Sequence, residues 1–173
     1  RITTKAKSLS EAKLLIKPIR KELYETFSTY IYGEDNDNLS TVVIKELIKR
    51  NESIVFAESC TGGLLSSQMT SISGSSKVFK GSVIAYSNEL KTLLLDVPKD
   101  LLNSYGAVSE EVAESMAIGV KNKLNSDWAI SVSGIAGPSG GYESKPIGLV
   151  FIAVASPNNE IIKIKKQYNP LRN

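Results

Sequence analysis

Residues 53–63 read SIVFAESCTGG, and this stretch decides the fold. Its first five residues form a short apolar run, which predicts a buried β-strand, and a helical pattern follows from Thr61 to about Ile72. At a strand-to-helix junction the free amides of the first helical turn point outward and stabilise a phosphate or a developing oxyanion. Residues 58–63 therefore indicate a functional site, although a serine cap on an ordinary helix has the same pattern.

Strand and helix patterns alternate on both sides of this junction. One helical pattern follows a predicted cap at Ser40, and three others cover residues 61–72, 88–95 and 109–124. Strand patterns cover residues 82–86, 128–133, 148–155 and 161–168. The last strand pattern alternates lysine with isoleucine, which is typical of a sheet edge with one solvated face. This alternation predicts an α/β fold in which a layered sheet is flanked by helices.

A polar, turn-rich stretch at residues 33–38 predicts a linker. Before it, apolar residues at helical spacing predict a helix over 10–27, which Pro18 should kink or interrupt. Short strand patterns at 1–6 and 30–32 would make this piece a small β-α-β unit. We therefore divide the chain into a small segment, residues 1–33, and a main domain, residues 39–173.

Composition excludes several classes of protein. The chain has 173 residues, of which 42% are hydrophobic and 23% charged, as in ordinary globular proteins. No apolar run approaches the roughly 20 residues needed to cross a bilayer, and the amino terminus does not resemble a signal peptide. A single cysteine fits a reducing compartment, so we expect a cytoplasmic protein without a membrane segment.

The net charge and the supply of metal-binding side chains exclude further classes of function. The net charge is +3, and the densest basic cluster is Lys163, Lys165 and Lys166. Because neither a recognisable nucleic-acid-binding module nor stacking aromatics accompany that cluster, a nucleic-acid partner is not favoured. With no histidine and one cysteine, a zinc site is not expected.

The missing histidine also limits the choice of a catalytic base. Residues 86–91 read YSNELK at a second strand-to-helix junction. A nucleophilic serine needs a base, and without histidine the serine–lysine pair is the simplest arrangement, here Ser59 with Lys91. Such a lysine must be partly neutral, which requires burial or a nearby cation, and Tyr86 could relay or orient its proton. The alternatives are a solvated Lys91 and a nucleophilic Cys60, which would have no histidine partner.

Two glycine-rich loops complete the pattern. In residues 106–111, Ser109 followed by two glutamates has the pattern of a helix cap, which by itself explains the segment well. Residues 133–141 read SGIAGPSGG and leave a predicted strand. So many glycines cost chain entropy, and they indicate left-handed turns or close approach of a ligand.

In this order and at these spacings, the segments 57–63, 86–88 with Lys91, 106–110, and 133–138 followed by 145–148 resemble the CinA carboxy-terminal domain family. Its members include the nicotinamide mononucleotide amidases, also called PncC. The resemblance covers Leu39 to Arg172, and residues 1–33 resemble the small, KH-like connecting domain of longer CinA proteins. Since the family pattern continues with a closing helix, we expect the carboxyl end here to be truncated.

This resemblance implies hydrolysis of nicotinamide mononucleotide to nicotinate mononucleotide and ammonia, by a homodimer that needs no metal or cofactor. Ser59 would attack the carboxamide, Lys91 would take its proton with help from Tyr86, and amides near Thr61 to Gly63 would hold the oxyanion. The substrate-binding residues that it implies are Cys60, Thr61, Gly62, Gly63, Ser109, Ser133, Gly134, Gly137 and Arg172. The alternatives are a catalytically weak nucleotide-binding or oligomerisation module, and a competence or damage protein that contacts nucleic acid.

Overall fold

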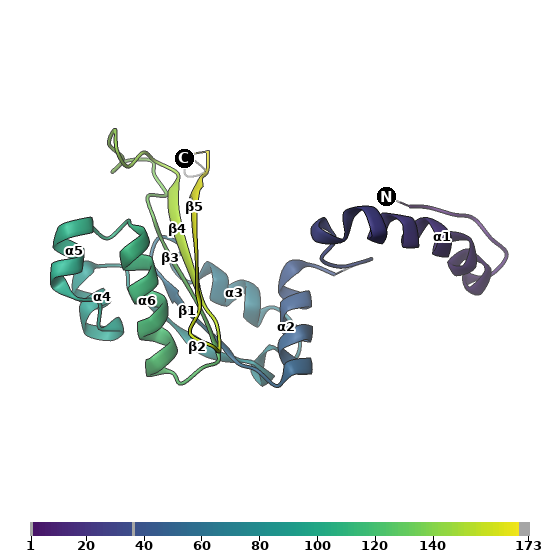
Figure 1. The fold of residues 1–173 in the computed structure, drawn as a ribbon, viewed down its shortest axis with the longest axis horizontal. Helices are drawn as coiled ribbons and strands as arrows, with labels where there is room; N and C mark the ends of the chain where they lie inside the picture. The colour runs from purple at the N-terminus through teal and green to yellow at the C-terminus, as the bar shows by residue number, and fades with distance from the viewer. Residues whose placement is uncertain (1, 36, 170–173) are drawn as a thin grey trace. The chain divides into compact units, whose positions relative to one another are not determined.

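The computed structural model describes residues 2–35 and 37–169, and it separates into two compact units with the division between Val42 and Val43. Each unit is described by itself. The second unit contains the β-sheet and the helices that cover it (Figure 1).

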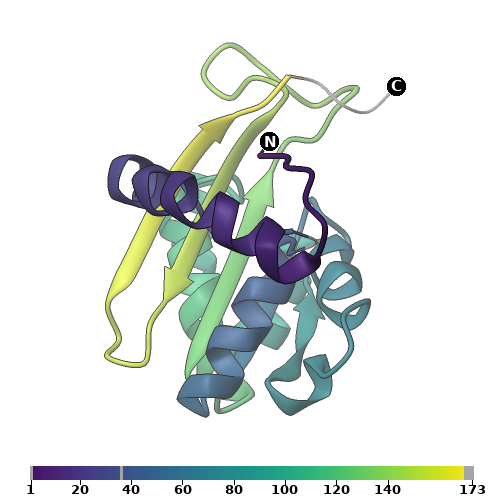
Figure 2. The same ribbon diagram turned by 90° about the vertical axis from the view of Figure 1, so that its right-hand side faces the viewer.

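The sheet has five strands in the order β2-β1-β3-β4-β5. Their bounds are β1 (Ile54–Glu58), β2 (Phe79–Ile84), β3 (Trp128–Gly134), β4 (Leu149–Ala155) and β5 (Ile161–Gln167). Strand β1 runs parallel to β2 and β3, whereas β4 and β5 continue the sheet in antiparallel pairs. Figure 2 shows β5, in yellow, at the edge predicted from its alternating lysines.

Helices cover both faces of the parallel part of the sheet (Figure 1). Their bounds are α2 (Leu39–Arg50), α3 (Leu64–Thr70), α4 (Asn88–Leu95), α5 (Lys99–Tyr105) and α6 (Glu110–Lys123). Because side chains alternate along a strand, Val55 and Ala57 pack in the core under α4 to α6, while Ile54 and Phe56 pack in the core under α2 and α3. Burial on both faces explains why β1 is a continuous apolar run rather than an alternating one.

The connections between the parallel strands place a ligand site at one end of the sheet. The chain passes from β1 through α3 to β2 on one face, and from β2 through α4, α5 and α6 to β3 on the other. Strand β1 thus lies between β2 and β3 at a point where the connections diverge. In open α/β sheets, ligands bind beyond the carboxyl ends of the strands at such a point.

The first unit is built around one helix, α1 (Leu9–Phe27), which begins at a Ser8 cap whose hydroxyl accepts from the Glu11 amide. Of the kink or interruption expected at Pro18, the interruption does not occur, because α1 runs through this residue as a single helix. The two expected strands are also wrong: residues 2–6 and 31–32 pair with nothing, and a 3-10 turn occupies Ser28–Tyr30. A strand needs a hydrogen-bonded neighbour, and the part of this unit that the structure describes offers none.

Several elements in the second unit differ from the sequence-based prediction, including α3, which begins at Leu64 and not at Thr61. The cap of α2 is Asn38, whose side-chain oxygen accepts from the Thr41 amide at 2.8 Å, and not Ser40. Helix α5 was not predicted, since its seven residues are too few to show a period. Strand β2 begins at Phe79, before the predicted start. The prediction began too late because Gly81, which lies where the pairing with β1 shifts register, breaks the apolar pattern.

Candidate active site

A cleft of about 280 Å³ lies beyond the carboxyl ends of β1, β2 and β3. Four of the segments singled out in the sequence meet there. The cleft is lined by Ser59, Cys60, Tyr86, Lys91, Ala107, Val108, Ser133, Gly134, Ile135, Ala136, Gly137, Ser139 and Gly140. It is therefore the place in the second unit where nucleophilic and basic side chains converge.

Ser59 is held by the main chain at the point where β1 ends. Its amide donates to the Val132 carbonyl of β3 at 3.0 Å, and the Ala85 amide that follows β2 donates to the Glu58 carbonyl at 2.9 Å. These bonds extend the ladder one step past the last residue of β1 on both sides. The Ser59 side chain is buried, with 7% of the residue exposed, so its hydroxyl is fixed in the floor of the cleft.

Lys91 is the largest fully buried side chain in the described part of the chain, with 1% exposed. It lies in α4, which begins at the Ser87 cap, and its Nζ lies 3.0 Å from the Ser59 Oγ. The same Nζ donates to the Ala85 carbonyl at 2.9 Å and to the Tyr86 carbonyl at 3.2 Å. The structure thus brings Ser59 and Lys91 into direct hydrogen-bonding contact.

The surroundings of Lys91 lower the pKa of its ammonium group. Burial lowers the pKa of Lys91, and the weaker opposing effects of Cys60 and Glu89 do not cancel it. A neutral amine has two N–H donors and one lone pair. In the neutral form, the carbonyls of Ala85 and Tyr86 would accept both N–H groups and leave the lone pair for the Ser59 hydroxyl. That is the geometry of a general base for serine.

Tyr86 lines the same cleft, but its contact with Lys91 is made by its main chain. The residue is 63% exposed. Its hydroxyl makes no hydrogen bond to residues 2–35 or 37–169. The ring is therefore at the mouth of the cleft, and the hydroxyl is not part of the hydrogen-bonded group around Lys91.

Sequence reasoning missed Glu58, which is fully buried beside the nucleophile. Its carboxylate accepts from the amides of Gly63, Leu65 and Ser66 at 3.0, 3.1 and 2.9 Å, and from the Ser66 hydroxyl at 2.5 Å. Burial would raise the pKa of Glu58, but the bonds from Ser66 and Leu65 outweigh it, so the pKa lies below its usual range. An acid ending an apolar strand just before a Gly-Gly helix start was the available signal.

This carboxylate changes which amides can hold an oxyanion. The Gly63 amide already donates to Glu58, and the Gly62 amide donates to the Ser59 carbonyl at 3.2 Å. Of the amides expected from Thr61 to Gly63, only that of Thr61 has no acceptor among residues 2–35 and 37–169. Within the same residues, the Thr61 hydroxyl is the one buried side-chain oxygen without a hydrogen bond.

The two glycine-rich loops are tied together at the rim. The Ser133 hydroxyl donates to the Ala107 carbonyl at 2.6 Å. The Ser109 hydroxyl donates to the Gly106 carbonyl at 2.9 Å and accepts from the Val112 amide at 3.3 Å, so it caps α6 as the sequence predicted. Ser109 does not line the cleft, and neither do Thr61, Gly62 or Gly63. Arg172 lies outside the described residues.

The loop after β3 presents main-chain donors to the cleft. Its base is closed by bonds from the Ile135 amide to the Leu149 carbonyl at 2.9 Å and from the Gly148 amide to the Ile135 carbonyl at 2.7 Å. Beyond that base, the amides of Ala136, Gly137, Ser139 and Gly140 have no acceptor in the part of the chain that the structure describes. Gly137 and Gly140 have φ of +82° and +90°, a conformation that favours glycine.

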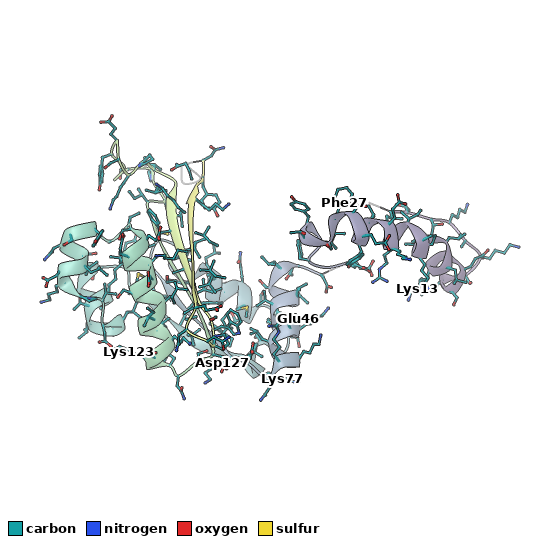
Figure 3. The ribbon with its side chains drawn as sticks, in the orientation of Figure 1. Lys13, Phe27, Glu46, Lys77, Lys123 and Asp127 are labelled. Atoms are coloured by element: carbon teal, nitrogen blue, oxygen red, sulfur yellow. The ribbon has the colours of Figure 1, made fainter. Side chains whose placement is uncertain are left out.

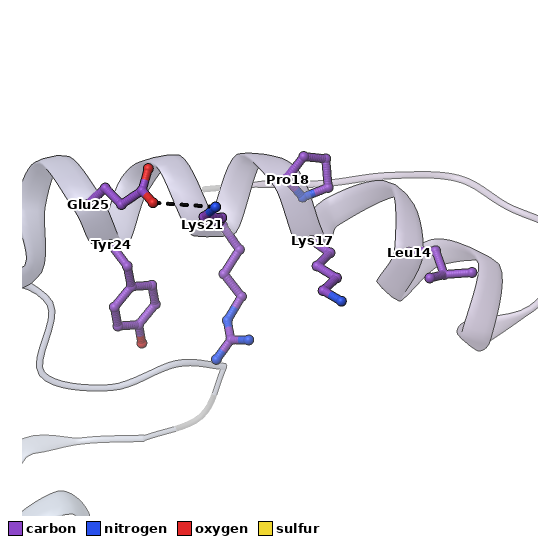
Figure 4. Close-up of a pocket in the computed structure, with 7 residues that line it drawn as sticks. Leu14, Lys17, Pro18, Lys21, Tyr24 and Glu25 are labelled. Carbon is purple, nitrogen blue, oxygen red and sulfur yellow. Dashed lines mark ion pairs between the residues drawn. The ribbon is translucent and has the colours of Figure 1, made fainter.

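Two other hollows among the described residues lack this chemistry. Figure 4 shows one along α1, lined by apolar and charged side chains, with an ion pair of 3.6 Å between Lys21 and Glu25. Another, at the opposite end of the sheet, includes Lys77 and Asp127 (Figure 3), but the Asp127 carboxylate is held by the Ser53 amide and hydroxyl, both at 2.7 Å. Among the described residues, no cluster of side chains could hold a metal ion and no helix is long and apolar enough to cross a bilayer.

Comparison with known proteins gives consistent results. The model of the CinA C-terminal domain family matches residues 36–173. "CinA-like protein" from Prochlorococcus marinus strain MIT 9215 is 64% identical over 173 residues, and that from strain MIT 9301 is 63% identical over 173 residues. Each alignment covers 100% of this chain and 41% of the relative, so the chain spans about two fifths of the length of these curated relatives.

Solved structures share the architecture. The competence/damage inducible protein CihA from Agrobacterium tumefaciens is 34% identical with a TM-score of 0.76, covering 82% of this chain and 86% of that one. The competence damage-inducible protein A from Klebsiella pneumoniae is 31% identical with a TM-score of 0.73, covering 76% of this chain and 81% of that one. The mixed α/β architecture predicted from the sequence is therefore confirmed.

Proposed function

The chain belongs to the CinA C-terminal domain family, and from that premise we propose that it hydrolyses the carboxamide of nicotinamide mononucleotide through an acyl-enzyme on Ser59. One observation carries the proposal: a buried Lys91 lies 3.0 Å from the Ser59 hydroxyl, with main-chain carbonyls accepting its other two bonds. The cleft supplies no histidine that could take this role, because the sequence has none.

The reaction begins when the Ser59 oxygen attacks the carboxamide carbon and the hydroxyl proton passes to the Lys91 amine. The tetrahedral intermediate collapses, the C–N bond breaks, and the proton on Lys91 leaves with the amide nitrogen as ammonia. Water then attacks the resulting ester while Lys91 accepts a proton. Nicotinate mononucleotide is released, and the Ser59 hydroxyl is restored.

Main-chain amides supply the binding groups in this proposal. The amides of Ala136, Gly137, Ser139 and Gly140 are the candidate donors to the ribose phosphate, and Arg172 stays a candidate phosphate ligand. We also propose that the protein acts as a homodimer in the cytoplasm, where the single Cys60 fits a reducing compartment.

The second candidate is a nucleotide-binding module with little catalysis. It is favoured by the names of the solved relatives, which refer to competence and damage and not to an enzyme. Both candidates use the same cleft, so they differ in turnover and not in binding.

Ammonia release from nicotinamide mononucleotide by the purified protein tests the proposal. We expect turnover that Ser59→Ala abolishes and that Cys60→Ala, the matched change at the adjacent cleft residue, leaves intact. Nucleotide binding by calorimetry without ammonia release would support the second candidate.

A further inference from the structure

The cleft offers no acidic side chain to a positively charged ligand. None of the residues that line it is aspartate or glutamate. The pyridine ring of the substrate proposed above carries a fixed positive charge, because its nitrogen is bonded to ribose. A cation entering a site without a carboxylate needs another electron-rich partner, and the face of an aromatic ring is the usual one.

Among the described residues that line the cleft, Tyr86 alone carries an aromatic ring. We propose that this ring is the platform on which the cationic pyridinium stacks, so that the site selects quaternary pyridinium carboxamides over neutral pyridine carboxamides. This inference rests on the proposed amidase function and deepens it. It assigns Tyr86 to specificity, whereas the family resemblance suggested proton transfer.

The setting of Tyr86 suits a platform better than a relay. Its carbonyl accepts from Lys91 at 3.2 Å, which fixes the start of the side chain next to the reacting pair. The residue is 63% exposed, so a ring face is available to a ligand. A tyrosine that relays protons needs a hydrogen-bonded hydroxyl, and within the described residues the Tyr86 hydroxyl makes no such bond.

A cationic ring also suits the base. Lys91 must be neutral to accept the Ser59 proton, and burial already lowers its pKa. A positive charge placed nearby disfavours the ammonium form and lowers that pKa further. A neutral pyridine carboxamide provides neither this effect nor the contact with the Tyr86 face.

Two small inhibitors that lack ribose and phosphate test the platform by itself: 1-methylnicotinamide, which is cationic, and nicotinamide, which is neutral. We expect the wild-type protein to bind the cation more tightly by between about twofold and thirtyfold, which corresponds to about 0.5–2 kcal/mol. Tyr86→Phe should keep this preference, Tyr86→Trp should strengthen it, and Tyr86→Leu should remove it. The matched control is Tyr30→Leu, a change at a tyrosine that is 83% exposed in the first unit.

Kinetics with nicotinamide mononucleotide separate the two roles of Tyr86. As a platform, Tyr86→Leu raises KM by a similar factor, and Tyr86→Phe keeps kcat. A large loss of kcat in Tyr86→Phe at constant KM would instead establish proton relay and overturn the proposal, as would an unchanged cation preference in Tyr86→Leu. If the wild-type protein releases no ammonia but calorimetry still shows the cation preference, the amidase function fails and the platform stands.

Discussion

Replacing Glu58 by glutamine should destabilise the second unit severely, although the two side chains have nearly the same shape. One carboxylate oxygen accepts from the Gly63 and Leu65 amides, and the other accepts from the Ser66 amide and hydroxyl. In either orientation, the NH₂ group of glutamine would face at least one main-chain amide, which cannot accept a hydrogen bond.

The magnitude follows from these contacts. Hydrogen bonds to a charged group contribute about 1.5–3 kcal/mol each, and one or two of the four would be lost. We therefore expect a loss of about 3 kcal/mol in the free energy of unfolding, which is a large part of the about 5–15 kcal/mol typical of a domain. For a chain of this size, the melting temperature should fall by roughly 6–12 °C.

Trp128 provides the assay, because it is the single tryptophan and lies in β3, with its indole N–H donating to Glu52 at 2.7 Å. Its fluorescence during denaturation by urea reports the unit that contains Glu58. The control is Glu46→Gln, at an exposed glutamate of α2 whose ion pairs are both 3.9 Å long (Figure 3). A stability for Glu58→Gln within about 0.5 kcal/mol of that control would refute the reasoning.

Acid gives a second check on the same carboxylate. Because the pKa of Glu58 is lowered in the folded state, its ionised form stabilises the fold above the unfolded pKa, and this contribution is lost as the pH falls through the folded pKa. The stability gap between wild type and Glu58→Gln should therefore be full at neutral pH and narrow in acid. A gap that does not change between neutral pH and strong acid would mean that the carboxylate charge is not what stabilises the turn.

The remaining predictions concern the reacting pair and one helix contact. Ser59→Ala should lower turnover by about a thousandfold or more without changing the fluorescence melt, and a mutant that keeps most of its activity would exclude serine catalysis. Lys91→Arg and Lys91→Met should both be nearly inactive yet folded, since arginine cannot release its proton near neutral pH; substantial turnover in Lys91→Arg would rule out lysine as the base. Because the base must be neutral and its pKa is lowered, activity should rise with pH through an apparent pKa below that of free lysine, as a pH–rate profile would show. Gly119→Ala in α6 should cost more than the usual gain from alanine in a helix, because its Cβ would lie 1.9 Å from the Leu95 carbonyl oxygen; a melting temperature at or above that of wild type would contradict this.

The parts of the fold that the sequence predicted are those that report burial directly. Strand β1 was predictable from its apolar run, because it is covered on both faces. Strand β5 was predictable from its alternating lysines, because one of its faces is exposed. The first half of β2 was missed, because the glycine at the register shift has no side chain to continue the pattern. The strands expected at residues 1–6 and 30–32 were wrong, because strand propensity cannot supply a neighbouring strand.

The site divides in the same way. Pairing Ser59 with Lys91 followed from elimination, since a chain without histidine leaves few bases, and the structure places the two side chains in contact. The acid before the Gly-Gly helix start was a signal for Glu58, but its role was missed because its partners lie five to eight residues ahead and reach it only after the chain turns into α3. Likewise, whether a given amide already has an acceptor depends on the folded turn. The sequence alone therefore could not exclude the Gly62 and Gly63 amides as oxyanion donors.

Much of the proposed machinery consists of atoms that every amino acid possesses. The carbonyls that orient Lys91 belong to Ala85 and Tyr86, and the donors around the loop after β3 are the amides of Ala136, Gly137, Ser139 and Gly140. Substitutions at such positions replace side chains but leave the participating atoms in place, provided that the backbone path is kept. Divergent relatives can therefore exchange many residues around the cleft while keeping its recognition chemistry, and alignments that score only residue identity will understate how closely two such sites agree. For such sites, similarity of main-chain geometry is a better measure of shared function than residue identity.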